Sequence, residues 1–135
     1  MNDSNDNPEK KVEPTPAELD ILQVLWEDGP STVRAVNERL NVQKKAVQYT
    51  STLKQMQLMV EKGLLVRDES SMKHVYSAAI EEGETKGALL DRFVDNLYNG
   101  SPSSLMMQLL GNKKTSKAEL DAIRSLLDQM SSDKE

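Results

Sequence analysis

The 135-residue sequence has no cysteine, one histidine and few aromatic residues, and each scarcity excludes a kind of chemistry. Without cysteine the chain has no disulfide, no thiolate metal site and no cysteine nucleophile. With His74 as its one histidine, it cannot hold zinc through a pair of histidines. It also lacks the GxSxG pattern of a serine nucleophile. These absences argue against an enzyme, and we expect neither a metal nor a cofactor.

Long hydrophobic runs are missing too. No apolar run approaches the ~18 residues that span a membrane. The amino-terminal residues lack the apolar segment of a secretory signal, and the polar composition of residues 1–13 predicts a disordered tail. We therefore expect a cytoplasmic protein.

Positive charge is scarce overall but concentrated in one stretch. The net charge is −5, yet residues 33–54 carry five bases against one acid, a local net charge of +4. Local charge decides what docks on a surface, so this stretch favours nucleic-acid binding. The alternative is an ordinary solvated helix face.

Capping residues and apolar spacing predict three helices and a hairpin within residues 14–80. Thr15 and Glu18 form the pattern of a capping box, so the first helix should span roughly residues 15–27. The second should run from Ser31 or Thr32 to Asn41. The third is predicted over residues 44–62, followed by strands at 64–68 and 74–77, with His74 half-buried on the second strand. This order is typical of a winged helix-turn-helix domain.

Three further helices are predicted within residues 81–131, at about 84–98, 102–110 and 116–130, with a frayed end at 132–135. Ser101 before Pro102 should cap the second of them, and Ser116 with Glu119 forms the capping-box pattern of the third. The apolar stripes of these helices are too extensive to face water, and about 50 residues seldom support a core alone. We expect this part to be a dimerisation domain, and the alternative is a single-chain globule. The residues predicted to pair with a second copy are Leu89, Leu90, Phe93, Val94, Leu97, Leu105, Leu109, Leu120, Ile123 and Leu127.

The predicted third helix carries short polar side chains that could read bases in the major groove. Candidate base contacts are Gln48, Thr50, Ser51 and Lys54, and ordinary helix surface is the alternative. Candidate contacts to the DNA backbone are Lys44, Lys45, Tyr49, Arg34 and Lys73. Tyr49 could equally pack beneath the helix, and Arg39 is a weaker candidate.

Three segments together resemble the BlaI/MecI family of bacterial repressors, which control penicillinase and methicillin-resistance genes. They are residues 18–29 (ELDILQVLWEDG), 49–64 (YTSTLKQMQLMVEKGL) and 97–110 (LYNGSPSSLMMQLL). The similarity spans roughly residues 15–130 and rests on the order and spacing of the segments.

The resemblance implies a mainly α fold with a small β-hairpin wing: a winged helix-turn-helix domain plus a carboxy-terminal three-helix dimerisation domain. It also implies a dimeric repressor on two-fold symmetric operator DNA, and induction by a membrane sensor protease that cuts an Asn-Phe pair. Gln108 and Leu109 occupy that position here, so the chain departs from the family at this point. The thiolate copper site of copper-responsive relatives is excluded because cysteine is absent.

Two other functions stay open from sequence alone. A winged helix can dock a protein partner, although the polar outer face of the third helix favours nucleic acid. A ligand-gated regulator could line a pocket in the helical part with some of the seven methionines, although methionine commonly fills cores.

Overall fold

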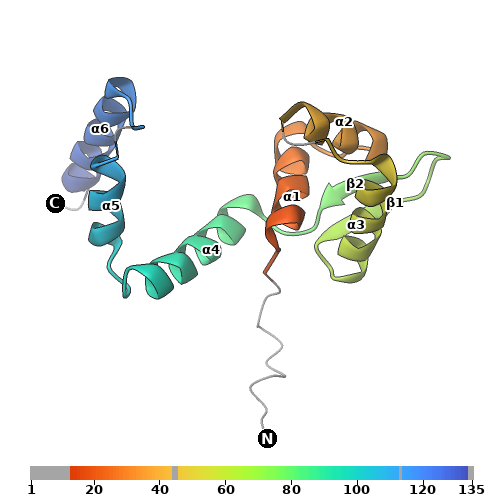
Figure 1. The fold of residues 1–135 in the computed structure, drawn as a ribbon, viewed down its shortest axis with the longest axis horizontal. Coiled ribbons are helices and arrows are strands. Elements are labelled where there is room, and N and C mark those ends of the chain that lie inside the picture. The colour runs from red at the N-terminus through yellow and green to blue at the C-terminus, as the bar shows by residue number, and fades with distance from the viewer. Residues whose placement is uncertain (1–12, 44–45, 113, 134–135) are drawn as a thin grey trace, which may run out of the picture. The chain divides into compact units, whose positions relative to one another are not determined.

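The computed structural model describes residues 13–43, 46–112 and 114–133, and six helices and one hairpin are found there (Figure 1). They are α1 (Pro16–Asp28), α2 (Val33–Gln43), α3 (Tyr49–Glu61), β1 (Leu65–Asp68), β2 (Val75–Ala78), α4 (Glu82–Leu97), α5 (Pro102–Leu110) and α6 (Lys117–Asp133). The predicted class, a winged helix-turn-helix with a helical part, is confirmed. The chain forms two compact units that divide within α4, between Ala88 and Leu89.

Helix α1 begins with the predicted capping box. The Thr15 hydroxyl accepts a hydrogen bond from the Glu18 backbone N–H at 3.2 Å, and a Glu18 carboxylate oxygen accepts one from the Thr15 N–H at 2.9 Å. These bonds satisfy donors that a helix start otherwise leaves unpaired. The helix ends at Gly29, whose φ of +82° suits a residue without Cβ.

Helix α2 is capped by Thr32 and not by Ser31. The Thr32 hydroxyl accepts from the Ala35 N–H at 3.2 Å. Ser31 instead exchanges two backbone hydrogen bonds with Tyr76, at 2.9 and 2.8 Å, which joins the α1–α2 connection to the hairpin. The helix continues to Gln43, so the predicted end at Asn41 is wrong by two residues.

Helix α3 begins at Tyr49, and the prediction that it starts at residue 44 is wrong. Residues 46–48 have no regular structure, because the backbone of Val47 is tied to side chains of α2. Lys44 and Lys45 lie outside the described residues. The helix ends as expected, with Lys62 at the C-cap and Gly63 at a φ of +84°.

The antiparallel hairpin pairs Leu65 with Ala78 and Asp68 with Val75, close to the predicted strands. The turn between β1 and β2 projects beyond the three helices and forms the wing (Figure 1). His74 precedes β2 and is exposed, so the prediction of a half-buried strand histidine is wrong. Met72, at the wing, is 99% exposed.

One hydrophobic core holds the first unit together. Its aliphatic members come from all three helices and the hairpin, and Tyr76 is buried among them. Trp26 packs at its edge and donates a hydrogen bond from Nε1 to the Ile80 carbonyl at 3.1 Å. This bond fixes the segment after β2 against α1, so the hairpin and its wing have a defined place beside the helices.

The second unit has well-formed helices but little interior. Ser101 caps α5 and Ser116 forms a capping box with Glu119 at the start of α6, as predicted. Val94 is the one hydrophobic residue under a tenth exposed among described residues from Leu89 onward. Helix α6 continues to Asp133, so residues 132 and 133 of the predicted frayed end are helical, and residues 134–135 lie outside the described residues.

Candidate nucleic-acid interface

The outward face of α3 is polar over its first two turns. Thr50, Ser51 and Lys54 are exposed, and Gln48 is exposed immediately before the helix. The opposite face packs into the core through Thr52, Met56 and Met59, each at most 2% exposed. The four predicted base-contact residues are therefore accessible on or beside one helix face. Short polar side chains on such a face can reach base edges in a major groove.

A groove of about 470 Å³ separates the start of α3 from the wing. It brings together Arg34, Tyr49 and Lys73, three of the predicted backbone contacts, from α2, α3 and the wing. Arg34 lies over the Tyr49 ring, 5.1 Å from its centroid, and Tyr49 is 39% exposed. Tyr49 is thus a wall of the groove and not a core residue. Gln57 and His74 line the same groove.

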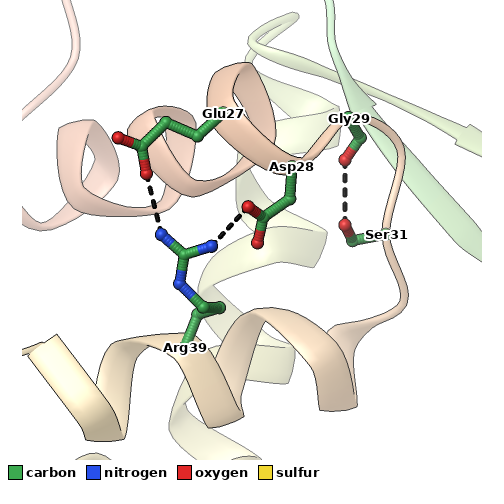
Figure 2. Close-up of polar contacts among 5 residues, drawn as sticks. All are labelled: Glu27, Asp28, Gly29, Ser31 and Arg39. Carbon is green, nitrogen blue, oxygen red and sulfur yellow. Dashed lines mark hydrogen bonds and ion pairs between the residues drawn. The ribbon is translucent and has the colours of Figure 1, made fainter.

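The two arginines of α2 have different surroundings. Arg39 is bonded to Asp28 and, at 2.8 Å, to Glu27, both at the end of α1 (Figure 2). Hydrogen bonds to Asp28 and Glu27 raise the pKa of Arg39. Arg34 forms no ion pair with any residue of the described segments. Arg39 is therefore neutralised within the chain, whereas Arg34 is available to an anion.

The wing carries one available base. Arg67 on β1 is paired with Glu69 at 2.6 Å, and its pKa is raised by hydrogen bonding with Tyr76 and Glu69. The Ser70 backbone N–H donates to Asp68 at 2.9 Å and lowers the pKa of that carboxyl. Lys73 is exposed. It has no ion-pair partner among residues 13–43, 46–112 and 114–133, which the structure describes.

Side chains of α2 hold the start of α3. The Asn37 amide donates to the Val47 carbonyl and to the Thr52 hydroxyl, both at 2.9 Å. The Asn41 side-chain amide donates to the side-chain oxygen Oδ1 of Asn37 at 3.2 Å, and the Asn41 Oδ1 accepts from the Val47 backbone N–H at 2.5 Å. Asn37 and Thr52 are buried, and a buried polar pair of this kind is stable only when it is hydrogen-bonded.

A buried carboxylate holds the other end of α3. Glu18 of α1 is 1% exposed and accepts from the Lys62 ammonium at 2.5 Å. Burial alone would raise the pKa of Glu18, but the Lys62 ammonium and hydrogen bonds from Thr15 lower it below its usual value. A buried charge with such partners stays ionised. The two ends of α3 are thus fixed by different polar contacts.

Sequence reasoning missed several residues of this surface. Gln57 and His74 line the groove, and Asn37, Thr52 and Glu18 support α3 from beneath. Gln57 could have been found from spacing, because it lies three residues after Lys54 on the same helix face. The supporting residues give no comparable signal, because their partners lie on other elements.

The predicted dimerisation residues do not share one environment. Val94 is buried within its own chain, and Leu89, Leu105 and Ile123 are half-buried. The remaining six are exposed, from 39% for Leu120 to 60% for Leu97: Leu90, Phe93, Leu97, Leu109, Leu120 and Leu127. Gln108 and Leu109 lie in the last turn of α5.

The described part of the chain lacks a metal site and a membrane-spanning helix. No group of three or more His, Cys, Asp or Glu residues is placed to hold a metal ion. No described helix is both long and apolar enough to cross a membrane.

The order of the helices and the hairpin defines a winged helix-turn-helix protein. The profile of the penicillinase repressor family matches residues 14–129. The chain therefore belongs to the penicillinase repressor family, a family of transcriptional repressors and not of enzymes.

Individual relatives agree with this assignment. The penicillinase repressor of Staphylococcus aureus is 26% identical over 123 residues, which cover 90% of this chain and 96% of the relative. The penicillinase repressor of Bacillus licheniformis is 25% identical over 114 residues, 84% of this chain and 88% of the relative. The methicillin resistance regulatory protein MecI of Staphylococcus aureus strain N315 is 22% identical over 124 residues, which cover 89% of this chain and 97% of the relative.

Proposed function

We propose that this protein is a sequence-specific DNA-binding repressor that acts in the cytoplasm as a homodimer on a two-fold symmetric operator. The observation that carries the proposal is the polar outer face of α3, flanked by the groove that contains Arg34, Tyr49 and Lys73. In this proposal α3 enters the major groove, where Gln48, Thr50, Ser51 and Lys54 contact base edges.

Phosphate contacts would come from both sides of the groove between the start of α3 and the wing. Arg34 and Tyr49 lie at the start of α3 and Lys73 lies across the groove on the wing, so a DNA strand along the groove would meet all three. Arg39 is left out of the proposal because Glu27 and Asp28 neutralise it. Lys44 and Lys45 stay sequence-based candidates.

The second unit supports the dimer. Eleven large hydrophobic side chains of α4, α5 and α6 are at least 39% exposed, among them Phe93, Leu97 and Leu127. Full burial of such a side chain contributes about 1.5–3 kcal/mol. A second copy would cover these faces, and a two-fold dimer would match a two-fold operator.

Induction through a sensor protease is not part of the proposal. The family's Asn-Phe pair is replaced by Gln108 and Leu109, and both residues lie within helix α5. A protease that reads Asn-Phe would therefore meet the wrong side chains.

The test is a pair of measurements on the full chain. Sedimentation equilibrium gives the oligomeric state, and a duplex is then selected by the protein from a random-sequence pool. Fluorescence-anisotropy titrations compare this selected duplex with a scrambled one at two salt concentrations. We expect a dimer that prefers the selected duplex by about 1,000-fold or more, with affinity that falls steeply with salt. Equal binding to both duplexes, or a flat salt dependence, would favour a protein partner instead.

A further inference from the structure

The start of α3 lacks the local cap that begins α1 and α5. Gln48 occupies the N-cap position, and its side chain makes no capping hydrogen bond. Thr15 and Ser101 do make such bonds at the starts of their helices. A helix without a cap has unpaired amides in its first turn and its start is poorly defined. Yet this first turn carries the side chains proposed to read DNA.

Asn37 and Asn41 of α2 supply the missing constraint. The Asn37 side-chain amide donates to the Val47 carbonyl, and the Asn41 side-chain oxygen accepts from the Val47 N–H, two residues before the helix. Asn37 also donates to Thr52 in the first turn of α3, and this contact is buried. One side chain therefore connects α2, the turn and α3.

We infer that Asn37 is a positioning residue for DNA recognition, which sets where α3 begins and how its first turn faces the DNA. This inference rests on the proposed function. Asn37 is only 8% exposed, so it does not itself face the DNA. It acts through Val47 and Thr52, which hold the backbone that carries Gln48, Thr50 and Ser51.

A positioning role and a merely stabilising role differ in a measurable way. Contacts to phosphates tolerate a shifted helix, because they carry no sequence information. Base contacts do not tolerate it, because each hydrogen bond needs its own geometry. Loss of Asn37 should therefore lower affinity for the selected duplex while affinity for scrambled DNA and its salt dependence change little.

The experiment compares Asn37→Ala with Val36→Ala, a change in a buried neighbour that leaves the asparagine bonds intact. Both variants lose stability, so titrations are run at a temperature where both are folded. We expect Asn37→Ala to lower the preference for the selected duplex about tenfold or more and Val36→Ala to keep it within about twofold. An unchanged preference in Asn37→Ala would overturn the inference.

Thr52 offers a second, milder pair of variants. Thr52→Ser keeps the hydroxyl that accepts from Asn37, whereas Thr52→Val keeps the shape and removes it. Thr52→Ser should retain the preference for the selected duplex, and Thr52→Val should reduce it about threefold or more. Equal behaviour of the two variants would contradict a role for this bond.

Hydrogen exchange separates failure of this inference from failure of the proposed function. In Asn37→Ala the amides of Val47, Ser51 and Thr52 should exchange about tenfold faster or more than in Val36→Ala, with no DNA present. Unchanged exchange would overturn the inference even if the wild-type chain prefers its duplex. If wild type shows no preference, the proposed function is wrong and the inference fails with it.

Discussion

Lys62, at the carboxyl end of α3, donates a hydrogen bond to the carboxylate of Glu18, which belongs to the first turn of α1 and is almost fully buried. The same carboxylate accepts from the Thr15 backbone and completes the capping box of α1. One side chain therefore begins one helix and fixes the end of another. The side-chain amide of Gln55 also donates a hydrogen bond to the Glu18 carboxylate, at 3.5 Å.

Glu18 should make folding stability depend on pH. Its pKa is lower in the folded chain than its usual value of 4.5, so the folded state binds fewer protons than the unfolded state. The favourable contribution is complete above that usual value and is lost as pH falls through the folded pKa. Urea unfolding followed by the fluorescence of Trp26 should show a steeper loss of stability from about pH 5 to about pH 3 in wild type than in Glu18→Gln.

This comparison isolates one carboxyl group. The pKa values of Asp68 and Glu119 are also lowered, by hydrogen bonds from Ser70 and Ser116, but both groups are present in both proteins. Parallel stability curves for wild type and Glu18→Gln would contradict the role assigned to Glu18.

Arg34 and Arg39 should behave differently although both lie on α2. Arg34→Ala should weaken binding to every duplex and reduce the slope of log affinity against log salt by about one for each phosphate that Arg34 neutralises. Arg39→Ala should leave that slope unchanged, because Glu27 and Asp28 already neutralise its charge (Figure 2). Anisotropy titrations at several salt concentrations measure both slopes. A smaller slope in Arg39→Ala than in wild type would mean that its ion pairs open on DNA.

The sequence predicted those helix starts that depend on nearby side chains. Thr15, Ser101 and Ser116 each accept from a backbone N–H three residues further on, so a short pattern reveals them. The start of α3 depends on Asn37, which bonds a carbonyl ten residues further along. No local pattern carries that information, and the prediction placed the start five residues too early.

Charge counting found the basic stretch but could not say which bases are available. Arg39 meets its acidic partners, Glu27 and Asp28, only when α2 packs beside α1. The groove that unites Arg34, Tyr49 and Lys73 likewise requires the wing to fold back beside α3. These are tertiary facts, whereas the residue types that face outward on α3 followed from helical spacing alone.

Substitution of Lys54 should weaken binding to the selected duplex more than substitution of any lysine of the second unit. It is exposed one turn after Thr50 on the outer face of α3. Lys54→Ala should weaken binding to the selected duplex about tenfold or more. Lys114→Ala, in the connection between α5 and α6, is the matched control and should change binding less than about twofold. If both variants bound like wild type, the assignment of α3 to DNA recognition would be wrong.

Leu127 of α6 tests whether the apolar faces of the second unit pair with another copy. It is 44% exposed and lies with Leu120, Ile123 and Met130 along α6, whereas Ser125 lies on the other side of the helix. A two-fold interface would bury Leu127 of both copies. Leu127→Glu therefore removes about 1.5–3 kcal/mol per copy from the free energy of dimer association. That change raises the dimer dissociation constant about 100-fold or more in sedimentation equilibrium.

Ser125→Glu is the matched control for Leu127→Glu, because it adds the same charge on the other side of α6 and should leave the dimer intact. The core of the first unit contains no residue of α6, so Trp26 fluorescence should report the same folded first unit in both variants. Far-UV circular dichroism, which reports the helices of both units, then separates a broken interface from loss of α6. A Leu127→Glu chain that still dimerises like wild type would place the interface elsewhere.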